Sequence, residues 1–325
     1  MWEIYMTFKL QVKDMKILRE LDFHARQPIS QIAKKIGLSP EVTAYRIKQL
    51  EKKGIITGYY PVIDLAKLGY LFCRYILELE RVGPEVEDKL FEFTKNYPSL
   101  GWFVLRSNMN VSIVGYVRSL DEAKQILEDL NTQFHTVLKT KKPSFATRIH
   151  HFRRNYLYGT KDRDDFITGE GVAVKIDDVD KKILCILCDN AKMPSTEIAE
   201  AVGLTAMAVI NRIRRLEKEK VLLAYRCALD LEKLGFTHQK VLLYIEQMSH
   251  KRKAQLFEYL RSHSPVVYIT EVFDEQDLEF EIQLKTFDQL NDFMIELRRQ
   301  FPEIKKYQSH AFHKEKLVRY IPKGF

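Results

Sequence analysis

The residues with the most evident chemistry in this sequence lie on one face of a predicted helix, and this face occurs twice. At 100° per residue, Thr43, Ile47 and Leu50 form an apolar stripe. The opposite face carries Glu41, Tyr45, Lys48 and Lys52 in the first segment, and Met207, Asn211, Arg214 and Lys218 in the second. A helix that presents such a face suits the major groove of duplex DNA.

Each side chain has an expected role on such a helix. Arg214 is the candidate to bind a guanine edge through two hydrogen bonds, and Asn211 to bind an adenine edge. Lys48 and Lys52 suit phosphates, where a point charge is sufficient. Four further candidates begin or flank the helices: Ser39 and Thr205, which can donate to a phosphate or a base edge, and Arg46 and Arg212, which brace the domain or reach the DNA backbone. The alternative is that each face is a solvated, charged helix surface.

Other residue patterns give weaker signals. Cys185 and Cys188 form a single CxxC, whereas a zinc ribbon needs a second pair. In the repeat described below they align with Arg19 and Asp22, so we expect this helix face to lie outside the deep core. Four histidines lie on predicted strands, where packing is commoner than metal binding: His150, His151, His310 and His313. The sequence predicts no catalytic, cofactor-binding or metal-binding residue.

The elements that hold the two helix faces are duplicated within the chain. Residues 14–80 align without a gap with residues 180–246. Identical pairs lie mostly at core and turn positions: Ile17/Ile183, Leu18/Leu184, Leu21/Leu187, Pro28/Pro194, Ile32/Ile198, Ala33/Ala199, Gly37/Gly203, Leu38/Leu204, Arg46/Arg212, Leu50/Leu216 and Asp64/Asp230. This pattern indicates a tandem duplication, in which two copies keep one fold and diverge on the surface.

Each copy begins with three predicted helices. In copy one the first spans about 14–22, and the second begins near Pro28 with Ser30 as its cap. Gly37 ends the second helix, Ser39 caps the third, and Pro40 occupies the tolerated first turn. A helix, a glycine turn and a helix form the helix-turn-helix pattern. The stretch "IITGYYPVID" that follows predicts a hairpin wing.

The rest of each copy alternates strands and helices. Copy one predicts a strand at 70–80, a helix at 84–97, two strands within 100–118, a helix at 121–138 and a strand at 144–156. Copy two predicts strands at 239–247, 266–273, 277–285 and 305–318, with helices at 250–263 and 287–300. This order is ferredoxin-like, with helices on one face of a four-stranded antiparallel sheet. The predicted fold class is α+β, with two winged helix-turn-helix domains each followed by a ferredoxin-like αβ sandwich.

The expected domain boundaries follow from this order. The winged helix-turn-helix domains occupy 1–64 and 177–230, the sandwiches occupy 65–157 and 231–325, and the polar segment 158–176 links the copies. Because helices cover only one face of each sheet, the other face must be covered too. We expect the sheets to pair, within one chain as a pseudo-dimer or between chains as a homodimer. The expected contacts are Val111, Ile113 and Gly115 with Leu278, Phe280 and Ile282.

The segments "IAKKIGLSPEVTAYRIKQLEKKGII" and "IAEAVGLTAMAVINRIRRLEKEKVL", with "IDLAKLGY" and "LDLEKLGF", resemble the Lrp/AsnC family of transcription regulators. The resemblance implies binding to double-stranded DNA, sandwich domains that pair into dimers, and a small effector such as an amino acid. Family sandwiches usually carry Gly-x-x-Asp near the ligand pocket. The matching positions are Ser107 and Asn110 in copy one, and Asp274 and Asp277 in copy two. Because glycine lets a backbone approach a ligand closely, an amino-acid effector is doubtful.

The composition bounds the class of protein. The 325 residues are 46% hydrophobic and 30% charged, as in ordinary globular domains, and the formal charge of +8 favours a polyanionic partner. The N-terminus lacks the features of a secretory signal, and no apolar run is long enough to span a bilayer. Four cysteines in this length fit a reducing cytoplasm. We therefore expect a cytoplasmic protein without a membrane segment.

A basic stretch at 139–163 allows two interpretations. Its aromatic residues, Phe145, Phe152, Tyr156 and Tyr158, interleave with cations, as in a second nucleic-acid surface. Equally, it fits an edge strand that its charges protect from aggregation, with aromatics facing the sheet. The sequence does not decide between them.

The sequence is compatible with four functions. The preferred one is a sequence-preferring, double-stranded DNA-binding regulator with two non-identical recognition helices. The alternatives are a non-specific DNA-architectural protein, a module that docks on transcription proteins, and an enzyme resembling sirohaem decarboxylases, which place histidine and arginine around a tetrapyrrole. The basic helix face in both copies favours DNA.

Overall fold

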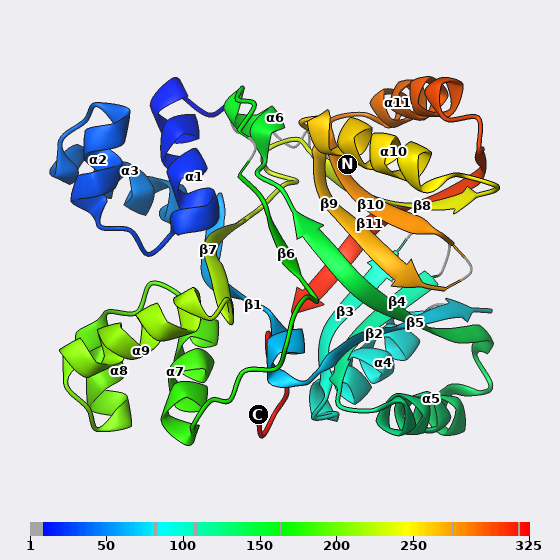
Figure 1. Cartoon of the computed structure of the whole chain (residues 1–325), viewed down its shortest axis with the longest axis horizontal. Coiled ribbons are helices and arrows are strands. Elements are labelled where there is room, and N and C mark those ends of the chain that lie inside the picture. The colour runs from blue at the N-terminus through cyan, green and yellow to red at the C-terminus, as the bar shows by residue number, and fades with distance from the viewer. Residues whose placement is uncertain (1–8, 81–82, 107–109, 163, 275, 318) are drawn as a thin grey trace.

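The computed structural model describes residues 9–80, 83–106, 110–162, 164–274, 276–317 and 319–325 (Figure 1). Copy one begins with three helices, α1 (Val12–His24), α2 (Ile29–Ile36) and α3 (Pro40–Lys52). Gly37 ends α2 in the left-handed conformation with φ of 67°, as the sequence predicts. The predicted cap Ser30 is wrong: it lies inside α2, and Pro28 occupies the cap position without a side-chain hydrogen bond.

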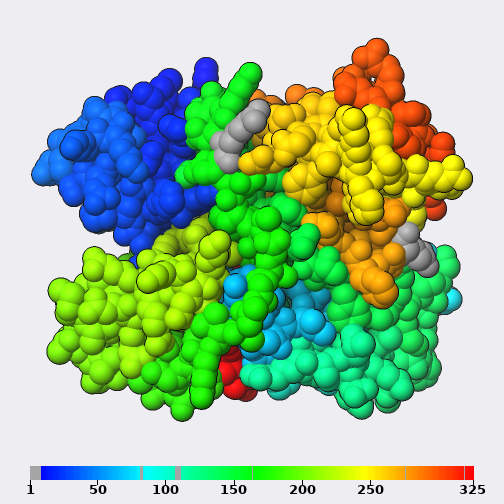
Figure 2. All heavy atoms as spheres, viewed as in Figure 1, coloured from blue at the N-terminus to red at the C-terminus, as the bar shows by residue number. Residues whose placement is uncertain are grey.

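Copy two repeats this arrangement with α7 (Asp178–Asp189), α8 (Ser195–Val202) and α9 (Ala206–Lys218). The side chains of Asp177 and Asp180 form a capping box that starts α7, and Gly203 ends α8 with φ of 70°. The two helical units share one hydrophobic core, to which Ile17 and Ile183 both belong. They lie next to each other at one end of the molecule (Figures 1 and 2).

A two-stranded antiparallel ribbon joins the two helical units. Strand β1 (Ile56–Ile63) pairs with β7 (Leu222–Leu229), with Tyr60 opposite Arg226. The predicted hairpin wing is therefore wrong in its local form, because the stretch after α3 is one strand and its partner comes from the other copy. A β-branched and aromatic run predicts a strand, but it carries no information on a partner so distant in sequence.

Each sandwich has the predicted ferredoxin-like order. Copy one contains β2 (Leu71–Leu79), α4 (Pro84–Asn96), β3 (Leu100–Arg106), β4 (Asn110–Val117), α5 (Leu120–Phe134) and β5 (Leu138–His151), after the 3-10 turn η1 (Leu65–Leu68). Copy two contains β8 (Thr237–Ile245), α10 (His250–Ser262), β9 (Val266–Phe273), β10 (Leu278–Leu284), α11 (Phe287–Gln300) and β11 (Ile304–Leu317). The strand orders are β5-β2-β4-β3 and β11-β8-β10-β9.

The two sheets join at both edges within the one chain. β3 pairs with β11, and β9 pairs with β5, so that among the described residues eight strands form a closed ring (Figure 1). Helices α4 and α5 pack outside copy one's half, and α10 and α11 outside copy two's half. The two sheets therefore pair within one chain along their edges, whereas we expected their faces to cover each other.

The residues that were expected to form the contact between the two sheets lie instead on the faces that the helices cover. Val111 and Ile113 pack in the core beneath α4 and α5, and Leu278, Phe280 and Ile282 pack beneath α10 and α11. Because side chains alternate along a strand, the faces inside the ring carry their neighbours instead: Arg74, Ser112, Val114, Lys240 and Glu281. The apolar alternation marked the helix-covered face, and the face inside the ring carries charged side chains among apolar and aromatic ones.

The basic stretch at 139–163 is used within the fold. β5 is an inner strand that pairs with β2, β9 and the short strand β6 (Phe166–Thr168), so the edge-strand interpretation is wrong. Its aromatics pack in hydrophobic cores, and Phe152 is 6% exposed. Several of its cations pair with carboxylates: Lys139 with Glu78, Lys142 with Asp274, Arg148 with Glu170 and Arg153 with Asp164. Residues after β5 form the one-turn helix α6 (Asn155–Tyr158), and the chain then crosses the middle of the molecule (Figure 2).

Candidate nucleic-acid interface

The start of α3 is fixed by its cap. The hydroxyl of Ser39 accepts a hydrogen bond from the backbone N–H of Val42 at 3.3 Å, and Pro40 follows at a position that needs no N–H partner. Thr43, Ile47 and Leu50 are buried, as the helix periodicity predicts. In α9 the hydroxyl of Thr205 caps Ala208 at 3.2 Å, and the buried stripe is Val209, Ile213 and Leu216.

The opposite faces of both helices are open to solvent. Tyr45 is 64% exposed and Met207 62%. Glu41, Lys48 and Lys52 on α3, and Asn211, Arg214 and Lys218 on α9, are also exposed. Among the described residues, none of the four cations Lys48, Lys52, Arg214 and Lys218 has a hydrogen-bond or ion-pair partner. The predicted faces are therefore available to a polyanion.

Arg46 and Arg212 differ from these cations because each is held by an acid of its own domain. The Nη1 of Arg46 lies 2.9 Å from Oδ1 of Asp14, and the Nη1 of Arg212 lies 2.8 Å from Oδ1 of Asp180. Each pair ties the recognition helix to the first turn of the first helix of its domain. We expected these arginines either to brace the domain or to reach the DNA backbone, and these ion pairs are those of a brace within the domain.

The two helical units are also tied directly to each other. The guanidinium of Arg26 donates to the carbonyl oxygens of Ala191 and Met193 at 2.8 and 2.7 Å. The ammonium of Lys192 lies 4.3 Å from the ring centroid of Tyr59. With the shared core and the ribbon, these contacts hold α3 and α9 on one body.

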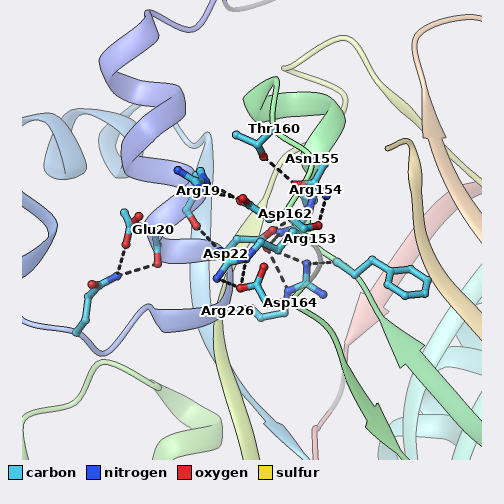
Figure 3. Close-up of polar contacts among 12 residues, drawn as sticks. Arg19, Glu20, Asp22, Arg153, Arg154, Asn155, Thr160, Asp162, Asp164 and Arg226 are labelled. Carbon is cyan, nitrogen blue, oxygen red and sulfur yellow. Dashed lines mark hydrogen bonds and ion pairs between the residues drawn. The ribbon is translucent and has the colours of Figure 1, made fainter. Parts of the chain in front are cut away.

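A buried ionic cluster joins the first helical unit to the ribbon and the ring (Figure 3). The Asp22 cluster consists of Asp22 on α1 and two arginines that hydrogen-bond to its carboxylate, Arg154 after β5 and Arg226 on β7. Oδ1 of Asp22 accepts from Nη1 of Arg154 at 2.6 Å and from Nη2 of Arg226 at 2.8 Å. Burial opposes ionisation of Asp22, but Arg226 and Arg154 outweigh it and lower the pKa of the carboxyl.

More exposed ion pairs surround this cluster. Arg19 binds Asp162 through two hydrogen bonds of 2.7 and 2.8 Å, and Arg153 donates to Asp164 at 2.6 Å and to the carbonyl of Arg19 at 2.8 Å (Figure 3). The segment after β5 is thus held against α1 by two arginine–aspartate pairs, Arg19 with Asp162 and Arg154 with Asp22, and by the hydrogen bond from Arg153 to the carbonyl of Arg19.

The second copy has no such ionic cluster among the described residues. By the alignment of the copies, Asp22, Arg154 and Arg226 correspond to Cys188, Tyr320 and Tyr60. The rings of Tyr60 and Tyr320 stack with centroids 5.2 Å apart, and Cys188 packs beside Ile321. The expectation that the face of Cys185 and Cys188 lies outside the deep core holds, because Cys185 is exposed and Cys188 half-buried, but the aligned Asp22, on which it rested, is fully buried. In the sequence, the one sign of this cluster was that Asp22 aligns with an uncharged residue, Cys188.

The weaker candidates show no convergent chemistry. No group of three or more potential metal ligands occurs in the described part of the chain. His150 lies 3.0 Å from Glu271, and His151 stacks on Phe166. Ser107, at the first position of the effector motif in copy one, lies outside the described residues. In copy two, Asp277 accepts from the backbone N–H of Ile245 at 2.7 Å, and Asp274 pairs with Lys142 at 2.8 Å.

Comparison with known proteins identifies the helical units. Residues 176–217 match the AsnC-type helix-turn-helix domain, and residues 10–57 match a winged helix-turn-helix DNA-binding domain. An uncharacterised HTH-type transcriptional regulator of Pyrococcus abyssi is 32% identical over 126 residues, which are 36% of this chain and 77% of that protein. The chain belongs to the Lrp/AsnC family. A second relative, the HTH-type transcriptional regulator FL11 of Pyrococcus horikoshii, is 27% identical over 37% of this chain and 79% of its own.

Each of these Lrp/AsnC relatives matches a little over a third of this chain, which is about the length of one of its two copies. Over the whole chain, the fold is similar to that of the sirohaem decarboxylase NirDL, with a TM-score of 0.62. The alignment covers 97% of this chain and 94% of that one at 14% identity, so the likeness concerns the fold alone. Among the described residues, no helix of this Lrp/AsnC protein is both long and apolar enough to cross a membrane.

Proposed function

We propose that this Lrp/AsnC protein is a sequence-preferring regulator that binds double-stranded DNA with two non-identical recognition helices in one chain. The observation that carries the proposal is the pair of exposed faces on α3 and α9, whose cations have no partner in the described part of the chain while the bracing arginines have theirs. Because the DNA lies in the cytoplasm of a prokaryotic cell, we place the protein there.

The two faces suit different contacts. Arg214 and Asn211 on α9 are exposed and of the residue types that bind base edges, and Met207 can contact a thymine methyl. On α3, Lys48 and Lys52 suit phosphates, and Glu41 can accept from cytosine. Ser39 and Thr205 cap the two helices, and their hydroxyls are candidates to donate to phosphate. The stronger direct readout is therefore assigned to copy two.

Binding to a labelled long duplex, measured by fluorescence anisotropy at several salt concentrations, tests the proposal. Neutralising about six phosphates gives a log–log slope of affinity against salt of roughly −5. Replacing Arg214 and Lys218 together by alanine should weaken binding strongly. Arg299→Gln, which removes a cation on the exposed surface of α11, is the matched control and should have little effect. A slope shallower than about −2, or equal losses in both variants, would contradict DNA binding through these helices.

Two alternatives predict other outcomes. A non-specific architectural protein would keep the salt dependence but bind all sequences equally. A tetrapyrrole enzyme would develop a porphyrin absorbance band when mixed with sirohaem. The likeness to NirDL extends to the fold and supports no activity by itself, and the exposed cations on α3 and α9 are the observation that favours DNA.

A further inference from the structure

A cavity of about 1560 Å³ occupies the inside of the strand ring and extends to the ribbon. Side chains from all eight ring strands line it, and strand β1 and helix α7 contribute Tyr60 and Cys188. Much of the wall is apolar or aromatic, with Phe72, Val114 and Phe312 among the lining residues.

The charged groups inside the ring are almost all paired. Arg74 donates from Nη2 to Oε1 of Glu279 at 2.9 Å, and Lys240 lies 2.9 Å from Glu281 and 3.1 Å from Glu279. Nearby, Lys142 pairs with Asp274 at 2.8 Å. Burial opposes ionisation of Glu279, but Arg74 and Lys240 hold its pKa down to about 2. These cations and carboxylates balance one another.

Arg106 is the exception. It stands at the end of β3 on the ring's inner face, is 4% exposed and lines the cavity. It has no hydrogen bond or ion pair to any residue that the structure describes, and its Nε is buried without a partner. Burial and the neighbouring charge of Arg74 lower the pKa of this guanidinium to about 10, so it remains charged at neutral pH. A buried, uncompensated cation is costly unless a counter-charge is present.

Among the described residues, further buried nitrogens near Arg106 lack a partner. They include Nε of Arg74 and Nε1 of Trp102, which both line the cavity, and Nδ1 of His310, two residues along β11 from the residue paired with Arg106. Burial, and then the charge of Arg106, lower the pKa of His310 to about 4. The imidazole is therefore neutral at neutral pH and adds no charge to the cavity. Within the described residues, Arg106 is thus a buried cation without an ion pair, with Glu279 acting on it only at a distance; Glu315 lines the same cavity, and burial raises the pKa of its carboxyl towards the neutral form.

We propose that the ring cavity binds a small organic oxyanion, whose carboxylate or phosphate group pairs with Arg106 and whose apolar body lies against Phe312, the residue opposite Arg106 on β11, and towards Val114. A guanidinium binds either group through two charge-assisted hydrogen bonds. A zwitterionic amino acid brings an ammonium group that gains nothing from Arg106, so the ligand carries net negative charge. The inference does not depend on DNA binding, and its test contains no DNA.

The experiment measures thermal unfolding and calorimetric binding of the full chain with benzoate and, separately, with inorganic phosphate. Sodium chloride keeps the ionic strength constant. At least one of the two probes should raise the melting temperature saturably, because it binds only the native state. Benzoate alone identifies a carboxylate, and phosphate alone identifies a phosphate.

Arg106→Met keeps the bulk of the side chain and removes its charge. It should raise the probe's Kd at least about tenfold, the loss expected for a charge-assisted hydrogen bond, and should melt above the wild type when no probe is present. Arg106→Gln, which keeps a donor, serves if the methionine variant does not fold and should show the same loss. Arg299→Gln, which removes an exposed charge, should leave Kd within about twofold. No shift with either probe, or an unchanged Kd in both Arg106 variants, overturns the proposal.

Discussion

Single side chains decide how each helical unit is held. The first unit docks through the fully buried Asp22 cluster, whereas the second docks at the equivalent place through Tyr60, Tyr320 and Cys188. A buried charge network depends on every partner, because removing one leaves the others uncompensated. The first docking contact is therefore sensitive to ionisation, and the second is not.

Asp22→Asn should lower the free energy of unfolding by about 3–5 kcal/mol, since it leaves Arg154 and Arg226 buried without a carboxylate. Urea unfolding measures the change. Asp178→Asn is the matched control, because that aspartate on α7 is 90% exposed and should cost less than about 0.5 kcal/mol. An equal effect of both substitutions would contradict the role given to the cluster.

The stability difference between the wild type and Asp22→Asn should depend on pH. The folded-state pKa of Asp22 lies below its unfolded value of about 3.9, so its contribution is fully present above that pH and is lost as the pH falls towards the folded pKa. The difference in stability between wild type and Asp22→Asn should therefore be constant near neutral pH and shrink in acid. A difference that grows in acid would contradict the direction of the shift.

On the recognition helices, Arg214→Ala should relax base preference in one half-site by about 1–3 kcal/mol. Lys48→Ala should weaken binding evenly across sequences, because a phosphate contact carries no sequence information. Competition binding against a panel of single-base variants of a preferred site separates the two effects. Identical profiles for both variants would argue against base readout by Arg214.

The exposure of these side chains was predictable, whereas the Asp22 cluster was not. A helical period of 3.6 residues assigns Thr43 and Lys48 to opposite faces whatever the rest of the fold does. A charged residue near the end of an amphipathic helix, however, is usually solvated, and only the positions of Arg154 and Arg226 in space make the burial of Asp22 possible.

At the scale of elements, most helices and strands of both sandwiches lie close to their predicted ranges, but their pairing partners had to come from the structure. β1 pairs with β7 and β3 with β11, and these partners lie far apart in sequence. Local patterns also left open which sheet face meets the helices. Apolar residues such as Ile113 were expected between the sheets, and instead lie under the helices because that side excludes water completely.

Ile113→Ala tests which face is the core. The side chain is fully buried beneath α4 and α5, so its truncation should cost about 2–5 kcal/mol. Leu120→Ala, at a residue 65% exposed, should change stability by less than about 0.5 kcal/mol. Chemical denaturation measures both, and a small cost at Ile113 would contradict the assignment.

At the scale of the molecule, the closed ring leaves each sandwich without a free pairing edge at β3, β5, β9 or β11 along their paired lengths. A partner chain is not needed to complete the fold, since the two copies already satisfy each other. Light scattering should therefore give the mass of one chain, 38.4 kDa, in the absence of DNA. A doubled mass that persists on dilution would mean that a second interface exists.

Duplication within one chain also removes a constraint on the DNA site. Regulators built from identical subunits place identical helices by two-fold symmetry, so their sites tend towards palindromes. Here α3 presents Glu41 and Tyr45 where α9 presents Met207 and Asn211. The central claim is that one chain reads two unlike half-sites.

Selection of binding sites from random duplexes, with the full chain at moderate salt, tests this claim most directly. The account predicts two dissimilar half-sites, with the sharper base preference in the one that Arg214→Ala relaxes. A perfect palindrome would contradict the asymmetric reader, and the absence of any sequence preference would contradict sequence-dependent recognition altogether.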